Sequence, residues 1–287
     1  MLSLAKLTLL GGTVLAGINA SAIKITHEPL LSKRITVIPN VMGGTYSNIA
    51  NVKSIAYFGL EGETDFRCTA SLIAPNVVIT AAHCITNSNA TDSSGWSNIR
   101  IGVGSVEPLP QNPNSYTVKS IIMHPDYINA PPFKNDIALI YLNECVPSTI
   151  ATPIDMAAPD MGNEQYIAAG FGQTSETDKS PTNVLEIIAT EGNQDICQEF
   201  FSTTEIGTTV ICIAQTNGSG TCYGDAGSPL YSDDYSMLLG VESAIVGVNG
   251  QVCDSENTIS IYTIPSGYMA WINDNVPCVG SNCDYDS

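Results

Sequence analysis

The sequence predicts an all-β protein with one helix close to the C-terminal end. Short runs rich in β-branched and aromatic residues alternate with Gly, Asn, Pro and Ser turns along the whole chain, as in barrels and sandwiches. The clearest runs are residues 77–80, 99–103, 116–122 and 137–142, then 184–189, 210–213, 238–241 and 259–263. The helix is predicted from Ser266, which can cap it, because Tyr268, Trp271 and Ile272 have the i, i+3, i+4 spacing of one buried face.

The N-terminal segment has the pattern of a secretory signal. One base, Lys6, precedes an apolar run over 7–16, and residues 20–22 (ASA) offer small side chains for cleavage. The alternative is a membrane anchor, but the run is shorter than the roughly 20 residues that a span requires. We therefore expect a signal peptide over 1–22, a propeptide-like segment over 23–40 and a secreted, extracellular protein.

Composition excludes several classes of partner. The 287 residues carry 28 acids and 10 bases, a formal charge of −18, so nucleic acid and anionic membranes are not expected partners. With 44% hydrophobic residues and only 13% charged ones, the chain is not a disordered acidic tail either.

Nine cysteines in an exported chain indicate disulfides. No pair has the C-x-x-C spacing of a zinc site, and the three histidines (27, 83 and 124) are scattered, so we expect no metal and no other cofactor. Nine is an odd number, so one thiol is free or links two chains. We expect a monomer unless that cysteine joins chains, as it would in a matrix protein.

Three segments in order carry a family resemblance: 80–84 (TAAHC), 135–139 (NDIAL) and 220–230 (GTCYGDAGSPL). Their order and spacing resemble the trypsin/chymotrypsin-like serine protease family, whose catalytic residues follow the order His, Asp, Ser. Residues 41–44 (VMGG) and 169–172 (AGFG) add to the resemblance, which covers roughly 41–276. It implies two antiparallel β-barrels with a short C-terminal helix, a protease-like domain over 41–277 and an acidic tail over 278–287.

The resemblance also implies disulfide pairings. It joins Cys68 to Cys84, Cys197 to Cys212, and Cys222 to Cys253. Cys145, Cys278 and Cys283 are left over. Either Cys145 ties down the C-terminal tail, or Cys278 closes to Cys283, and the sequence leaves both open.

One member of the expected catalytic triad is missing. The resemblance places His83 as the base and Asp136 as the residue that orients it, but Ala226 stands where the nucleophilic serine belongs. A methyl group has no lone pair, and loss of such a nucleophile lowers turnover about 10⁶-fold in an analogous triad. The amides of Gly224 and Ala226 would form the oxyanion hole.

Two alternatives keep the protein active. Ser228 could serve as the nucleophile, although two residues along the backbone displace its hydroxyl by several ångströms from where attack needs it, at about 3 Å. Alternatively, Ala226 is an engineered replacement of a native serine.

Further changes at the specificity pocket favour a lost activity. The resemblance assigns Gly220 to the pocket base, where trypsin-like members have an aspartate, and Ser260 to the pocket wall. Residues 243–245 (SAI) stand where Ser-Trp-Gly is typical, so Ser243 keeps its type while Ile245 replaces a glycine. Glu242 places an acid in an apolar strand.

The sequence also bears on activation by cleavage and on glycosylation. The resemblance matches Val41 and Asp225 to the pair that forms when family members are cleaved. Asn40 offers a trypsin-like activator no basic residue, so either another protease cuts after it or the chain stays zymogen-like. Asn89 and Asn217 begin Asn-x-Ser/Thr sequons.

Together these observations predict a secreted serine protease homologue that has lost catalysis and acts by binding a protein. Such homologues serve as decoys, inhibitors or cascade regulators, so the resemblance points to a protease or another hydrolase as the partner. The alternative is an active secreted serine endopeptidase.

Overall fold

A computed structural model describes residues 44–63, 68–87, 93–161, 165–174, 183–190, 197–215, 219–246, 253 and 259–280. All of them belong to one compact unit, Val37–Ser287. The expected signal, the propeptide-like segment, Val41, Cys283, Asn89 and Asn217 lie outside the described residues. No described helix is long and apolar enough to cross a membrane.

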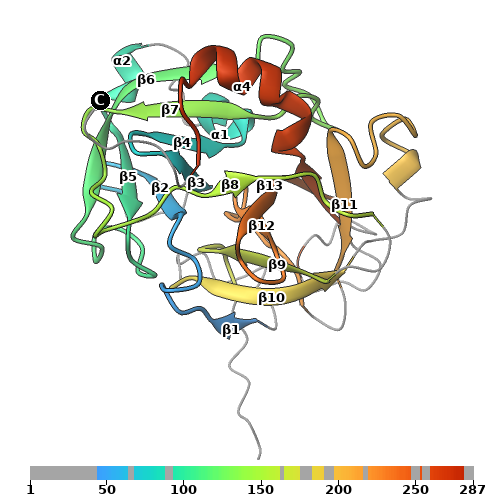
Figure 1. Ribbon diagram of the computed structural model, residues 1–287, viewed down its shortest axis with the longest axis horizontal. Helices are drawn as coiled ribbons and strands as arrows, with labels where there is room; N and C mark the ends of the chain where they lie inside the picture. Colours follow the sequence, from blue (N-terminus) through green and yellow to red (C-terminus); the bar gives the residue numbers. More distant parts are fainter. Residues whose placement is uncertain are drawn as a thin grey trace, which may run out of the picture. The chain divides into compact units, whose positions relative to one another are not determined.

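The first half of the chain forms a closed antiparallel barrel (Figure 1). Around the barrel its strands follow the order β2 (Ile55–Leu60), β3 (Cys68–Ala74), β4 (Val77–Thr80), β7 (Ala138–Leu142), β6 (Ser115–Met123) and β5 (Ile99–Val103). Strands β3 and β4 are buried along their whole length, which suits their many β-branched and small apolar side chains. Two short helices, α1 (Ala82–Asn87) and α2 (Ser93–Trp96), follow β4.

The second half forms an eight-stranded sheet (Figure 1). Its path runs β1 (Thr45–Tyr46), β10 (Leu185–Thr190), β9 (Gln165–Gly170), β12 (Pro229–Ser232), β13 (Met237–Val246), β14 (Ile259–Thr263) and β11 (Val210–Ala214). These neighbours are antiparallel, whereas β8 (Asp155–Met156) pairs in parallel with β13. The predicted all-β architecture is confirmed. Hydrogen bonds close the first barrel, but among the described residues they do not close the second sheet.

The C-terminal helix is present, but its expected cap is wrong. A 3-10 turn, η2 (Pro265–Tyr268), leads into α4 (Met269–Asn275), and Ile264 rather than Ser266 precedes the first turn. Neither start has a side-chain cap, and Ser266 lies inside the 3-10 turn rather than at the position before it. The expected buried face is formed, with Tyr268 and Ile272 in the core.

Three disulfides have the pairings that the resemblance implied: Cys68–Cys84, Cys197–Cys212 and Cys222–Cys253. Cys145 is free and exposed, while Cys278 is disulfide-bonded. A bond between the tail and Cys145, one of the two options above, is therefore excluded.

The two halves meet in one shared core. Ile55 and Leu139 of the first barrel belong to the same hydrophobic cluster as Tyr231 and Val241 of the second sheet. A hydrogen bond of 3.0 Å between the Ser54 and Tyr231 hydroxyls also crosses this junction. Two further hydrogen bonds cross it, from the Ser243 hydroxyl to Asp136 and from the Thr69 amide to the Ala226 backbone oxygen.

Candidate active site

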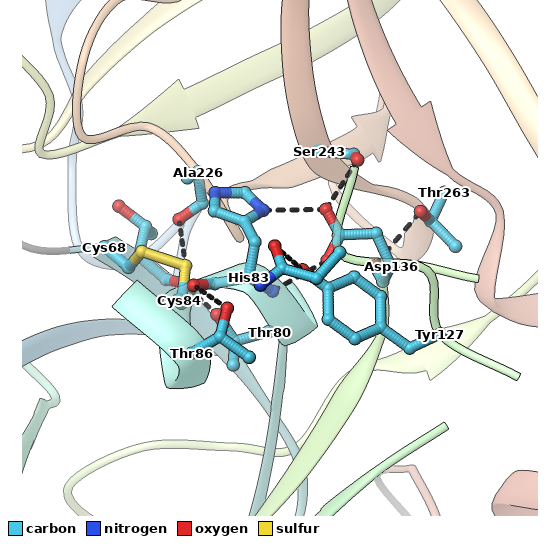
Figure 2. Close-up of polar contacts among 12 residues, drawn as sticks. Cys68, Thr80, His83, Cys84, Thr86, Tyr127, Asp136, Ala226, Ser243 and Thr263 are labelled. Atoms are coloured by element: carbon cyan, nitrogen blue, oxygen red, sulfur yellow. Dashed lines mark hydrogen bonds and ion pairs between the residues drawn. A yellow bond between two sulfur atoms is a disulfide. The ribbon is translucent and has the colours of Figure 1, made fainter. Parts of the chain in front are cut away.

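The structure brings His83 and Asp136 into direct contact (Figure 2). His83 lies in the first turn of α1, immediately after the buried strand β4, and Asp136 precedes β7, the neighbour of β4 in the barrel. Asp136 Oδ2 is 2.7 Å from His83 Nδ1, and the backbone amide of His83 donates to Oδ1 at 2.8 Å. The carboxylate therefore fixes both the backbone and the ring of His83.

Residues of the second sheet complete the surroundings of Asp136. The Ser243 hydroxyl donates to Oδ2 at 2.7 Å, and the Thr263 hydroxyl donates to the backbone oxygen of Asp136 at 3.1 Å. Asp136 is fully buried, and His83 is 8% exposed. Phe133 stacks on the imidazole with ring centroids 4.9 Å apart and planes 11° apart. The ring is thus held from its edge and from one face.

Ala226 stands at the other side of the imidazole (Figure 2). The ring nitrogen that does not contact Asp136 faces toward it, and both residues line the same pocket. The backbone oxygen of Ala226 accepts a 2.8 Å hydrogen bond from the Thr69 amide, which ties this loop to the first barrel. The general base is therefore in position, but the side chain beside it has no hydroxyl to activate.

The Ala226 loop keeps the glycines that its course requires. Gly227 has a φ of +81°, and a Cβ there would come within 2.1 Å of the Thr69 backbone oxygen, so no larger residue fits. Gly224 has a φ of +98° and lines the pocket, while its role in an oxyanion hole stays a prediction.

Ser228 is turned away from this chemistry. It is fully buried, its Oγ has no hydrogen-bond partner among the described residues, and it does not line the pocket beside His83. A nucleophile needs hydrogen-bond contact with its base. The alternative of a Ser228 nucleophile gains no support from this geometry.

Asp225 is a fully buried acid held by backbone amides. It accepts hydrogen bonds of 2.9 Å from the amides of Gly172 and Cys222. A Cβ at Gly172 would lie 2.5 Å from the carboxylate, which explains why the AGFG segment has a glycine there. Burial raises the pKa of Asp225 to about 7 in spite of the two amide donors. Since Val41 lies outside the described residues, its pairing with Asp225 stays a prediction.

A pocket of about 160 Å³ opens beside His83 and Ala226. Of the expected specificity residues, Ser243 and Ile245 line it, together with Glu242, Ala244 and four residues of the nucleophile loop. Gly220 and Ser260 do not line it.

The reason is Gln215, which the sequence analysis did not single out. Its side chain packs onto Gly220, where a Cβ would come within 2.2 Å, and its amide donates to the Thr221 backbone oxygen at 2.8 Å and to the Ser260 hydroxyl at 3.1 Å. Gln215 therefore fills the space at the expected pocket base. No motif marks Gln215, and its contact with Ser260 follows only from the pairing of β11 with β14.

A larger hollow of about 260 Å³ lies away from this site, beside Lys53, Asp155 and Tyr235. No histidine lines it, so it has no counterpart of the His83–Asp136 pair. The candidate active site is therefore the smaller pocket.

Comparison with known proteins agrees with the geometry. The trypsin family matches residues 41–272, most of the chain. The chain belongs to the trypsin family.

Trypsin-family relatives are recognisable at moderate identity. A CLIP domain-containing serine protease, B10, of Anopheles gambiae is 26% identical over 84% of this chain and 71% of its own length. Phenoloxidase-activating factor 3 of Holotrichia diomphalia is 29% identical over 75% of this chain and 65% of its own length, so this chain spans under two thirds of that relative. Among solved structures, neuropsin, a serine protease expressed in the limbic system of mouse brain, matches with a TM-score of 0.66 over 80% of this chain and 97% of its own, at 23% identity. That likeness supports the fold.

Proposed function

We propose that this trypsin-family protein is catalytically inactive and acts by binding another protein. One observation carries the proposal: the side chain beside the free imidazole nitrogen of His83 is the methyl group of Ala226 (Figure 2). The imidazole then has no hydroxyl of residue 226 to deprotonate, and the buried Ser228 hydroxyl has no hydrogen-bond partner among the described residues.

The preserved parts of the site fit a binding role. Ser243, Asp136 and His83 form a connected, buried hydrogen-bond chain that keeps the pocket rim rigid. Tyr223, which lines the same pocket, is 52% exposed, and exposed aromatic side chains are common at the centres of protein interfaces. The pocket is thus shaped to receive part of a partner.

A protein of a protease cascade is the proposed partner. Two of the relatives are phenoloxidase-activating factors, and several others are CLIP domain-containing serine proteases. A homologue without a nucleophile would act there as a decoy, an inhibitor or a regulator of another protease. We propose that it does so as a monomer unless Cys145, which is free and exposed, joins two chains.

We further propose that the protein is secreted. The signal-like pattern of residues 1–22 supports export, and three disulfides fit an oxidising extracellular compartment. Processing to a domain over 41–277, pairing of a new Val41 terminus with Asp225, and glycans at Asn89 and Asn217 belong to the same proposal.

A fluorophosphonate probe tests the loss of catalysis directly. We expect no covalent labelling of the purified full chain, because the residue at the nucleophile position, Ala226, has no hydroxyl for His83 to activate (Figure 2). The matched variants are Ala226→Ser, which restores the hydroxyl, and Ala226→Ser with His83→Ala, which removes the base again. Labelling of the unmodified protein that disappears in Ser228→Ala would overturn the proposal.

Peptide hydrolysis by Ala226→Ser gives a second readout. We expect the single change to stay nearly inactive, because Ile245 and Gln215 have altered the pocket as well. Adding Ser228→Gly and Ile245→Gly should raise hydrolysis above the single variant. Brisk hydrolysis from the single change would show that only the nucleophile was lost.

A further inference from the structure

Two cysteines and one imidazole lie together at the candidate active site. The Sγ atoms of Cys68 and Cys84 and a ring nitrogen of His83 are all within 4.8 Å of one another, and the three residues are buried. Two thiolates and one imidazole are a donor set that binds zinc in proteins. Because the two sulfurs form a disulfide, the donor set is complete only when that bond is opened.

The hydrogen bonds of His83 orient its outer nitrogen, Nε2, for a metal ion. Nδ1 lies 2.7 Å from the Oδ2 atom of the buried Asp136, and the Ser243 hydroxyl donates to the same oxygen. A carboxylate in this position holds the proton on Nδ1 and leaves the lone pair of Nε2 free, as in the carboxylate–histidine–zinc arrangement of metalloproteins. Phe133 stacks on one face of the ring and restricts its rotation. The nitrogen ligand is therefore already oriented.

Ala226 leaves this nitrogen available. A serine at this position would offer its hydroxyl to Nε2, whereas the methyl group of Ala226 makes no such hydrogen bond. No hydrogen bond from the described residues reaches Nε2. The backbone oxygen of Ala226 lies 3.7 Å from Cys84 Sγ, so the disulfide adjoins the same loop (Figure 2). Since His83 lines the pocket of about 160 Å³, an ion can approach it from the solvent.

The spacing of the three donor atoms suits a tetrahedral ion. With Zn–S bonds of about 2.3 Å and a Zn–N bond of about 2.0 Å, the ligand atoms of tetrahedral zinc lie about 3.5–3.8 Å apart, inside the 4.8 Å limit of this cluster. We propose that opening the Cys68–Cys84 disulfide with a dithiol reductant creates a zinc site here, with both cysteines and His83 as ligands and Asp136 as the residue that orients the imidazole. The inference does not depend on the identity of the protein partner.

The site forms in two balanced steps. Thiol–disulfide exchange first passes two electrons from the dithiol to the Cys68–Cys84 bond, so that the bond breaks, both sulfurs become thiols and the dithiol becomes a disulfide. Zn²⁺ then displaces the two thiol protons and binds the thiolates and Nε2 of His83. Three protein ligands leave the fourth position of a tetrahedral ion open, for water or for a donor atom of a partner in the pocket.

Cobalt(II) is the first probe, because thiolate coordination to it is visible in the absorption spectrum. The full chain carries Cys145→Ser, which removes the one free cysteine among the described residues. It is reduced with a phosphine, which brings no competing thiol, and the phosphine is removed before the metal is added. We expect thiolate-to-cobalt absorption that saturates at one ion per chain and disappears when Zn²⁺ displaces the cobalt. The unreduced chain should show none.

Matched histidine variants identify the site. His83→Ala removes a ligand and should weaken Zn²⁺ binding to the reduced chain by more than about 100-fold, the upper range for loss of a group that only supports a ligand. Asp136→Asn removes such a supporting group and should cost about 10–100-fold. His124→Ala is the control, since that histidine packs against Tyr268 and Trp271, and it should leave the affinity unchanged.

Absence of the cobalt absorption in the folded, reduced chain would overturn the proposal, and so would equal Zn²⁺ affinity in His83→Ala. If reduction unfolds the chain, Cys68→Ala decides, because it frees the Cys84 thiol without a reductant. That variant keeps two ligands and should bind Zn²⁺ weakly, with binding lost when His83→Ala is added; no binding, or binding that survives this addition, would contradict the site. Fluorophosphonate labelling of the oxidised chain tests the loss of catalysis separately, so the two failures are distinguishable.

Discussion

The two sides of the candidate active site differ in how well their polar groups are satisfied. On the side built by the first barrel, Asp136 accepts hydrogen bonds from the amide and the ring of His83 and from Ser243. On the side built by the second sheet, the nucleophile position is apolar. Four of the five buried side-chain atoms without a partner in the described residues lie on that side: those of Gln215, Ser228, Glu242 and Tyr262.

This difference indicates what holds each part in place. The His83–Asp136 pair contributes to the fold whether or not a reaction takes place, because removal of either partner would strand buried donors or a buried charge. A residue that serves only as the nucleophile or as a wall of the substrate pocket has no such structural role. Ala226 and Ile245 could replace the residues expected there without breaking a network.

The largest expected effect tests the structural role of the first-barrel side. Asp136→Ala leaves the ring nitrogen and amide of His83 and the Ser243 hydroxyl without their acceptor, so we expect a loss of about 3–5 kcal/mol of unfolding free energy. Urea unfolding measures it. Asp233→Ala, at an exposed acid, should change stability by less than about 0.5 kcal/mol. A cost below about 1 kcal/mol for Asp136→Ala would mean that the pair persists for another reason.

The second expected effect is a dependence of stability on pH that comes from the second-sheet side. The pKa of Asp225 is raised from 3.8 to about 7 by burial, so between these values the folded chain holds a proton that the unfolded chain has lost. Stability must therefore fall as pH rises through this window, by about 3 kcal/mol from pH 5 to pH 8. Glu242 contributes in the same direction, since its pKa is also raised.

Urea midpoints at pH 5 and pH 8 measure this fall in the full chain. Glu242→Gln should make the fall smaller without abolishing it, because the Asp225 contribution remains. Glu107→Gln serves as the control because that acid is exposed. The lowered pKa values of Glu205 and Asp234, about 2 each, act only at more acidic pH. An unchanged midpoint between the two pH values would show that a cation outside the described residues already neutralises Asp225.

The sequence was sufficient for the architecture and for the first-barrel side of the site. Alternating β-branched runs predicted the strands, and the TAAHC and NDIAL segments identified His83 and Asp136, because each motif is contiguous in the chain. The cap at Ser266 was wrong because Pro265 takes over the start of the turn. Motifs and strand-forming runs that are contiguous in the chain can be recognised from a single sequence.

The second-sheet side was harder to predict because its contacts depend on tertiary packing. Gln215 contacts Gly220 and Thr221, its near neighbours in the sequence, and reaches Ser260 across the pairing of β11 with β14. The sequence showed that Glu242 was an unusual residue for a strand, but not that its carboxyl group would lack a partner. Hydrogen-bond satisfaction depends on tertiary packing, which no motif encodes.

The smallest expected effect compares two buried tyrosines of the second sheet. The Tyr231 hydroxyl shares a 3.0 Å hydrogen bond with Ser54, whereas the Tyr262 hydroxyl, beside Glu242, has none in the described structure. Tyr231→Phe should therefore cost about 1–3 kcal/mol, because it leaves the Ser54 hydroxyl buried and unpaired. Tyr262→Phe should be neutral or stabilising, since it removes a polar group that is already unpaired. Thermal unfolding of the two variants side by side measures the difference, and equal losses would mean that the Tyr262 hydroxyl is satisfied in solution, for instance by a water molecule in the pocket wall.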